Sequence, residues 1–181
     1  MTTSRRTLLA VGGSLFAGVA NAAATDAFGF SFPSIEDGIL DFAAYRGRVL
    51  LVTNTASFCG YTYQYEALEK LHATLEGRGL TVVGIPSQDF NQEKDNAAEV
   101  KAFCDATFGV QFPMTGLLHV RGGNADPFYR WVRTQKNWEP SWNFNKVLIG
   151  RNGQILGTYG SEDEPQGPRL RRAIESALAI S

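Results

Sequence analysis

The chain has 181 residues, of which 44% are hydrophobic, and its formal net charge is −1. This length suffices for one domain with a substantial core, and the charge provides no basic surface of the kind that binds nucleic acid. The two cysteines and two histidines do not have zinc-site spacing, and no glycine-rich phosphate loop follows a strand. We therefore expect a single domain that uses neither a metal nor a cofactor.

The N-terminal segment TTSRRTLLAVGGSLFAGVANAAA has the layout of an export signal. Arg5 and Arg6 precede a mildly apolar stretch that leads to small residues ending in Ala-Asn-Ala, and adjacent arginines favour the twin-arginine route. The alternative is a membrane anchor, but Leu8–Ala20 is shorter than the roughly 20 residues that spanning requires. We predict that residues 1–24 are a cleavable signal and that residues 25–181 form an exported, periplasmic domain.

Strand-like and helix-like segments alternate along the remaining chain. In its first half we predict an edge strand or hairpin of residues 28–32 with the segment near Ile39, a buried strand over Val49–Thr53, a helix over Thr62–Gly77 and a buried strand over Leu80–Ile85. In its second half we predict a helix over Asn96–Thr107, a strand over Leu117–Val120, a helix over Asp126–Arg133, a hairpin of Val147–Ile149 with Ile155–Tyr159 and a helix over Pro168–Ala179. This order indicates an α/β domain with a mixed sheet and helices on both faces, which is a thioredoxin-like fold.

Cys59 lies between a predicted buried strand and the helix that follows it, in NTASFCGYT. Near a helix N-terminus, the partial positive charge and the backbone N–H groups stabilise a thiolate relative to a thiol. Loops that follow central parallel strands are also where such sheets place their sites, which favours a reactive cysteine over an inert one. Because the residue three positions on is Thr62, exchange through a vicinal dithiol is excluded.

A thiolate at this position could be a hydrolytic nucleophile, a metal ligand or a redox centre. A hydrolase needs a general base, and we interpret His72, on a helix flank, and His119, near a strand end, as structural residues. The chain offers too few soft ligands for a metal site. The remaining interpretation is a peroxidase-like role, in which the thiolate attacks an O–O bond and becomes a sulfenic acid.

Two separated motifs resemble the glutathione peroxidase family. The stretch NTASFCGYTYQYEALEKLHATLEGRGLTVVGIPS is similar to that family's Cys-Gly-x-Thr-x-Gln-Tyr segment, and WNFNKVLIGRNG is similar to its Trp-Asn-Phe-x-Lys signature. FCDATFGVQFPM and DPFYRWV match the pattern between them, so the resemblance covers about residues 28–180. It implies a thioredoxin-like fold and reduction of peroxides.

The resemblance also implies roles for individual residues. Cys59 takes the position of the peroxide-reducing residue, with sulfur rather than selenium. Gln92, Trp142 and Asn143 take the positions of the other members of the active-site tetrad. Indole and amide N–H groups can donate hydrogen bonds to a thiolate and to the departing hydroxide without adding a competing charge.

The segment IPSQDFNQEKDN departs from the family pattern Phe-Pro-Cys-Asn-Gln-Phe. Ser87 stands where a cysteine often lies, and the loop is one residue shorter and lacks the common Glu-Pro-Gly. If the shorter loop folds differently, Gln88 rather than Gln92 is the candidate for the tetrad amide.

Cys104 lies in the predicted helix before FGVQFP. This is the position of the resolving cysteine in the thioredoxin-dependent branch of the family. The residue alone would be interpreted as a small core residue. The resemblance implies that Cys104 attacks the sulfenic acid of Cys59 and that a thioredoxin-like dithiol protein reduces the resulting disulfide. The short connection RTQKNWEPSW, where glutathione-using tetrameric members have an insertion, implies a monomer with a site open to bulky lipid hydroperoxides.

The sequence thus predicts an exported thiol peroxidase that acts on hydrogen peroxide or on organic and lipid hydroperoxides. Two alternatives remain open. One is a redox sensor or thiol oxidase that passes a Cys59–Cys104 disulfide to a client protein. The other is a thioredoxin-like binding module that has lost activity.

Overall fold

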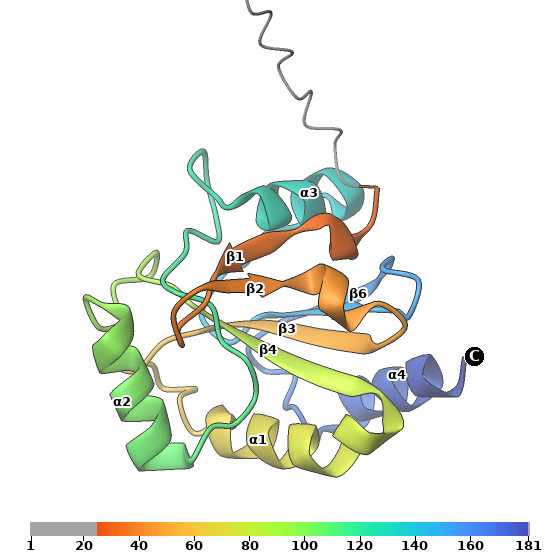
Figure 1. Cartoon of the computed structure of the whole chain (residues 1–181), viewed down its shortest axis with the longest axis horizontal. Coiled ribbons are helices and arrows are strands. Elements are labelled where there is room, and N and C mark those ends of the chain that lie inside the picture. The colour runs from red at the N-terminus through yellow and green to blue at the C-terminus, as the bar shows by residue number, and fades with distance from the viewer. Residues whose placement is uncertain (1–24, 181) are drawn as a thin grey trace, which may run out of the picture.

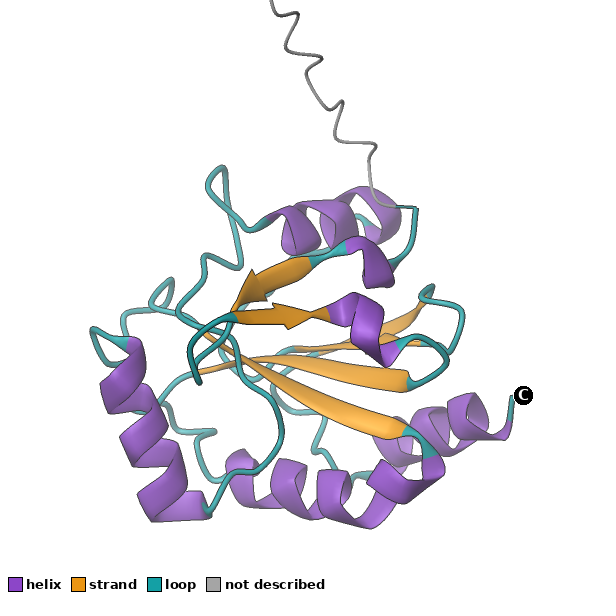
Figure 2. Cartoon of the chain, in the orientation of Figure 1, coloured by secondary structure: helices purple, strands orange, loops and turns teal. Residues whose placement is uncertain are grey.

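The computed structural model describes residues 25–180, so the predicted export signal lies outside the described residues. The centre of the fold is a four-stranded sheet in the order β4-β3-β5-β6 (Figures 1 and 2). Its strands are β3 (Val49–Thr55), β4 (Leu80–Pro86), β5 (Lys146–Ile149) and β6 (Ile155–Tyr159). β3 pairs with β4 in parallel, whereas the β3–β5 and β5–β6 pairs are antiparallel. The sheet is therefore mixed, as the sequence predicts for a thioredoxin-like fold.

A small hairpin and four helices surround this sheet. The hairpin pairs β1 (Ser31–Pro33) with β2 (Ile39–Asp41), in the place where the sequence predicts one. The helices are α1 (Gln64–Leu75), α2 (Ala97–Phe108), α3 (Pro127–Lys136) and α4 (Pro168–Ala179), and short 3₁₀ turns occupy Ala27–Gly29, Phe42–Tyr45 and Glu76–Arg78. Each helix lies within a few residues of its predicted range.

The two faces of the sheet are covered by different elements. Alternate strand side chains point to opposite faces, so Leu51 packs with α1 and α4 while its neighbour Val52 packs with α3 and the hairpin. In Figure 1 α1 and α4 accordingly lie on one side of the sheet and α3 on the other. The strands β3 and β4 are buried along their whole length, which explains their nearly continuous apolar sequence.

The predicted strand over Leu117–Val120 is wrong. The segment 117–121 is irregular, and Leu118 N donates to the carbonyl of Pro86, the last residue of β4, at 3.0 Å. The Asp89 carboxylate accepts hydrogen bonds from Val120 N and Arg121 N, at 2.6 and 3.1 Å. At the end of the segment a side chain distant in sequence therefore replaces the strand partner that the apolar run alone would suggest.

Within residues 25–180, no helix is long and apolar enough to cross a membrane. The same residues contain no group of three or more histidine, cysteine or acidic side chains arranged to hold a metal ion.

Candidate active site

Cys59 lies in the turn that joins β3 to α1, and it is 8% exposed. Thr62 closes this turn: its N–H donates to the Cys59 carbonyl at 3.0 Å, and its hydroxyl accepts from Cys59 N at 3.1 Å. The same hydroxyl donates to the Ala56 carbonyl at 2.9 Å. The Tyr61 N–H points at the sulfur, with an N–Sγ distance of 3.4 Å. Thr62 occupies the position that a second cysteine has in dithiol redox proteins. Here its hydrogen bonds stabilise the turn that contains Cys59.

The two predicted amides meet beside this turn. Asn143 Nδ2 donates to Gln92 Oε1 at 2.9 Å, and the main-chain carbonyl of Gln92 accepts from Phe58 N at 2.9 Å. Asn143 is buried and Gln92 is half-buried. The main chain of Gln92 is therefore bonded to the residue that precedes Cys59, and its side chain is bonded to the Asn143 amide. In the described part of the chain, neither amide donates a hydrogen bond to Sγ.

Trp142, the fourth predicted residue, precedes Asn143 at the rim of the site. It is 40% exposed, and its ring lies 5.3 Å from that of Phe90 in a tilted arrangement. Among the described residues, the Trp142 indole N–H has no hydrogen-bond partner, and it makes none with Sγ. It is thus a donor that remains free for a molecule arriving at the rim.

The alternative candidate Gln88 has a different role. Its side-chain amide donates to the Glu93 carbonyl and accepts from Glu93 N at 3.1 Å, so the amide nitrogen and oxygen are both bonded to the backbone of Glu93. Gln92 rather than Gln88 is therefore the amide that contacts Asn143. The side chain of Gln88 fixes the shortened loop in the shape that puts Gln92 there.

Glu93 is a residue near the site that sequence reasoning missed. One carboxylate oxygen accepts from Ser57 N at 3.0 Å and from Lys94 N at 2.8 Å. The other oxygen, Oε2, is buried without a partner in the described part of the chain. Burial raises the pKa of Glu93 above its ordinary value, and the hydrogen bonds from Ser57 and Lys94 oppose this increase. The loop 88–93 is therefore joined to the Cys59 turn through both Gln92 and Glu93.

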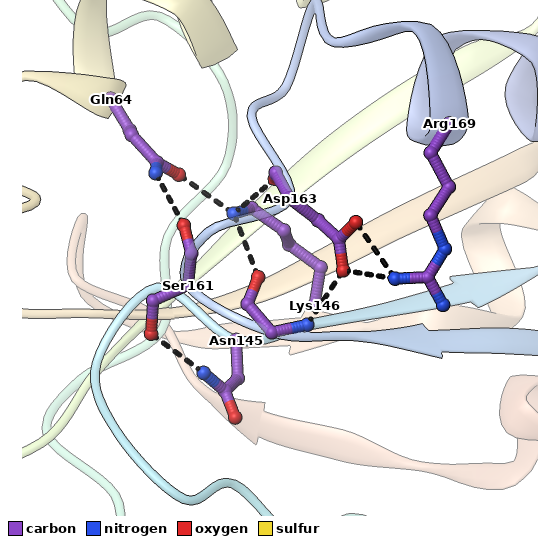
Figure 3. A network of polar contacts seen from close by, with 7 residues as sticks. Gln64, Asn145, Lys146, Ser161, Asp163 and Arg169 are labelled. Carbon is purple, nitrogen blue, oxygen red and sulfur yellow. Dashed lines mark hydrogen bonds and ion pairs between the residues drawn. The ribbon is translucent and has the colours of Figure 1, made fainter.

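The backbone of Trp142 and Asn143 is held from behind by buried polar side chains. Asn54 Nδ2, at the end of β3, donates to the Trp142 carbonyl at 3.0 Å. Ser161 Oγ donates to the Asn143 carbonyl at 2.7 Å, and Asn145 Nδ2 donates to Ser161 Oγ at 2.9 Å. Figure 3 shows Ser161 and Asn145 within a larger network that reaches α1. The loop that carries two of the predicted site residues is thus fixed by side chains from β3, from the residue before β5 and from the segment after β6.

Cys104 lies on α2 and is 1% exposed. It belongs to the same core cluster as Cys59, and the two cysteines are free thiols in this structure. Burial raises the pKa of the Cys104 thiol to about 11, because the apolar surroundings disfavour the thiolate. An open cavity of about 220 Å³ adjoins Cys104, between α2 and residues 110–114. The predicted resolving cysteine is therefore a buried thiol in this structure, and its raised pKa favours the protonated form at neutral pH.

The two histidines have structural contacts. The buried His72 accepts from Val82 N through Nδ1 at 3.4 Å, and burial lowers its pKa. The exposed His119 pairs with Asp89 at 2.6 Å between Nδ1 and Oδ1. No described contact places either ring at Cys59, which leaves the cysteine without a histidine base.

Aromatic side chains are exposed around the Cys59 turn. Phe58 is 63% exposed and Tyr63 is 54% exposed, and Trp142 forms part of the rim. The Lys94 ammonium lies 4.7 Å from the centre of the Phe58 ring. The approach to the cysteine is therefore partly apolar.

Comparison with known proteins gives a consistent result. The family model described as glutathione peroxidase matches residues 27–133. A glutathione peroxidase-like peroxiredoxin of Schizosaccharomyces pombe is 39% identical over 152 residues, covering 81% of this chain and 95% of that protein. A hydroperoxy fatty acid reductase of a Synechocystis species is 34% identical over 149 residues, covering 76% of this chain and 88% of that protein. The crystal structure of Trgpx in apo form, which is 33% identical, covers 86% of this chain and 97% of its own, with a TM-score of 0.69.

Proposed function

The chain belongs to the glutathione peroxidase family, and from this membership we propose that it reduces hydroperoxides through Cys59. The observation that carries the proposal is the meeting of Gln92 and Asn143 beside the turn that presents the Cys59 sulfur. The Cys59 thiolate attacks one peroxide oxygen, and the O–O bond breaks as the S–O bond forms. The second oxygen leaves as hydroxide or alkoxide and takes up a proton, which yields water or an alcohol.

Neutral donors suit this step because negative charge moves from the sulfur to the leaving oxygen. The Tyr61 N–H stabilises the thiolate before the reaction, and the Trp142 indole and the two amides are the proposed donors to the oxygens of a bound peroxide. None of these groups can replace the thiolate as the nucleophile.

We further propose that Cys104 resolves the oxidised enzyme. The Cys104 sulfur attacks the sulfur of the Cys59 sulfenic acid, and an S–S bond forms as hydroxide leaves. The thiol must first lose its proton, which its pKa of about 11 opposes in the closed fold. Opening of α2 would release this thiol to solvent and also allow the approach that disulfide geometry requires.

A dithiol protein of the thioredoxin type is the proposed reductant of the Cys59–Cys104 disulfide. The names of two relatives, a peroxiredoxin and a hydroperoxy fatty acid reductase, support a thiol-based cycle and a bulky organic substrate. The exposed aromatic side chains of Phe58, Tyr63 and Trp142 are compatible with such a substrate, because an acyl chain can lie against them.

Export and assembly are part of the same proposal. The twin-arginine-like segment in residues 1–24 supports folded export to the periplasm, and the short connection before Trp142 supports a monomer. Fractionation of cells that express the full chain, compared with an Arg5→Lys/Arg6→Lys variant, tests export. Retention of the wild type in the cytoplasm would contradict it.

Peroxide consumption by the reduced protein with a thioredoxin system tests the activity. Turnover of hydrogen peroxide or cumene hydroperoxide is expected for the wild type, and none is expected for Cys59→Ser. Absence of wild-type turnover would favour the inactive binding module. Formation of the disulfide with transfer to a client, without rapid peroxide consumption, would favour the redox sensor.

A further inference from the structure

Lys146 is a lysine whose side chain is fully buried, at 0% exposure, on β5. Its ammonium group donates to Gln64 Oε1 at 2.7 Å, to the Asp163 carbonyl at 2.8 Å and to the Gly160 carbonyl at 3.4 Å. Figure 3 shows these contacts converging on Nζ from α1 and from the segment that follows β6. All three acceptors are uncharged oxygens, so within residues 25–180 the ammonium is hydrogen-bonded but forms no ion pair.

The carboxylates near Lys146 either bind other groups or lie beyond ion-pair distance from its ammonium. The Asp163 carboxylate accepts from Gly160 N at 3.0 Å and from Arg169, on α4, at 2.6 and 2.8 Å. Glu162 and Glu164 lie on the same loop and act on the ammonium from a distance. Gln64, which faces it from α1, is neutral. Burial consequently lowers the pKa of Lys146 to about 8, and the three carboxylates only partly oppose this decrease.

A buried cation without a counter-ion is a poor source of stability. Desolvation of such a group costs free energy, and an apolar side chain of similar volume is often equally stabilising or better. The presence of a lysine at this position therefore suggests a role other than stability, and its contacts with Gln64 indicate which one.

Lys146 fixes the orientation of the Gln64 amide. Because the ammonium can only donate, the Gln64 oxygen must face it, and the Gln64 amide nitrogen then faces the Ser161 carbonyl, to which it donates at 2.7 Å. The Ser161 hydroxyl in turn donates to the Asn143 carbonyl at 2.7 Å. One side of Gln64 is thus connected to the loop that carries Asn143.

The main chain of Gln64 is hydrogen-bonded to the Cys59 turn. Gln64 is the first residue of α1, and its N–H donates to the Tyr61 carbonyl at 2.9 Å. The Tyr61 N–H is the donor that contacts Cys59 Sγ at 3.4 Å. Gln64 therefore connects the Cys59 turn, through its backbone N–H, with the Asn143 loop, through its side-chain amide, and Lys146 determines how that side-chain amide points.

We propose that Lys146, as an ammonium ion, is a positioning residue that holds the Cys59 turn and the Asn143 loop in register for peroxide reduction. This inference rests on the proposed function. When Lys146 loses a proton, the amine keeps two N–H donors for three acceptors, and its lone pair can accept from a flipped Gln64 amide. The connection through Ser161 is then lost, and the reaction of Cys59 with peroxide slows.

The pH dependence of Cys59 oxidation tests this proposal. The second-order rate constant of the reduced protein with hydrogen peroxide would be measured by stopped-flow tryptophan fluorescence from neutral to alkaline pH. We expect the wild-type rate constant to fall as the pH rises through about 8. Lys146→Met should react roughly tenfold to a hundredfold more slowly at neutral pH, as expected for a misplaced reacting group, and should lack the alkaline decrease. Lys70→Met, an exposed lysine on α1, is the matched control and should behave as the wild type.

A second variant covers the case in which Lys146→Met does not fold. Gln64→Glu keeps an oxygen against Nζ and adds a counter-ion, so the alkaline decrease should move to higher pH although the neutral rate constant falls. An NMR titration of the Lys146 ¹³Cε chemical shift measures the same ionisation independently of activity, and its midpoint should also move to higher pH in Gln64→Glu. If wild-type oxidation through Cys59 shows no alkaline decrease, or if Gln64→Glu leaves its midpoint unchanged, the positioning role is wrong and the proposed function stands. If the wild type does not react with peroxide, the proposed function fails first.

Discussion

Weakening the start of α2 should accelerate formation of the Cys59–Cys104 disulfide. In α2 two of twelve residues are buried, against six of twelve in α1, so α2 is held by few core contacts. Its N-cap is Asn96, whose Oδ1 accepts from Glu99 N at 2.9 Å and whose Nδ2 donates to Glu99 Oε1 at 2.7 Å. Asn96→Ala removes both contacts, which costs roughly 1 kcal/mol for an N-cap.

The size of the expected increase in the rate of disulfide formation can be calculated if α2 opens before Cys104 attacks the Cys59 sulfenic acid. With a pKa of about 11, the closed Cys104 thiol is ionised in only about one molecule in ten thousand at neutral pH, and exposure to solvent raises that fraction about a hundredfold. Destabilising the closed helix by roughly 1 kcal/mol should then increase the open population, and the rate of disulfide formation, about fivefold.

Quenched-flow mass spectrometry of the peroxide-treated protein measures the conversion of sulfenic acid to disulfide. Asp126→Ala is the control, because it removes the corresponding N-cap contact to Phe128 N, 2.8 Å long, from α3, which does not carry Cys104. The control should lose similar stability without faster conversion. An unchanged or slower conversion in Asn96→Ala would refute resolution through an opened α2.

Three further predictions concern the donor set and the core. Trp142→Phe should slow oxidation of Cys59 by roughly one to two orders of magnitude if the indole donates to the peroxide. An unchanged stopped-flow rate constant would show that Trp142 only packs against Phe90. Phe128→Ala, at a fully buried ring in contact with five aromatic neighbours, should lower the free energy of unfolding by about 3–5 kcal/mol in denaturant titrations, whereas a loss below about 1 kcal/mol would contradict its central place in the core. Because burial raises the folded-state pKa of Glu93, its contribution to stability is largest below the unfolded-state value and is lost as the pH rises through the folded-state pKa. Glu93→Gln should remove that part of the pH dependence, and identical melting curves across mildly acidic and neutral pH in both proteins would show that Glu93 does not titrate there.

The fold was largely predictable because its main elements carry strong local signals. The apolar runs of β3 and β4 and the helical spacing of Leu68, Leu71 and Leu75 correspond to fully buried side chains. The predicted strand at Leu117–Val120 does not form, because only Leu118 N bonds the neighbouring β4 and the backbone from Val120 onward donates to the Asp89 carboxylate instead. No local sequence pattern indicates a carboxylate partner about 30 residues away.

The candidate site was predictable where short motifs carry it and not where long-range contacts build it. Cys59 and Asn143 lie in two such motifs, whereas the choice between Gln88 and Gln92 needed the loop conformation. Lys146 could not be identified as buried, since a lysine in sequence is expected at the surface. Its position emerges only when β5, α1 and the segment after β6 come together.

Intact-mass analysis of the reduced protein after one equivalent of peroxide tests the central claim most directly. The account predicts that the wild type acquires the mass of an intramolecular disulfide, that Cys104→Ser acquires one oxygen on Cys59 and stops, and that Cys59→Ser remains unmodified. Oxidation of Cys59→Ser at the wild-type rate, or normal turnover of Cys104→Ser with a dithiol protein, would contradict the two-cysteine peroxidase cycle.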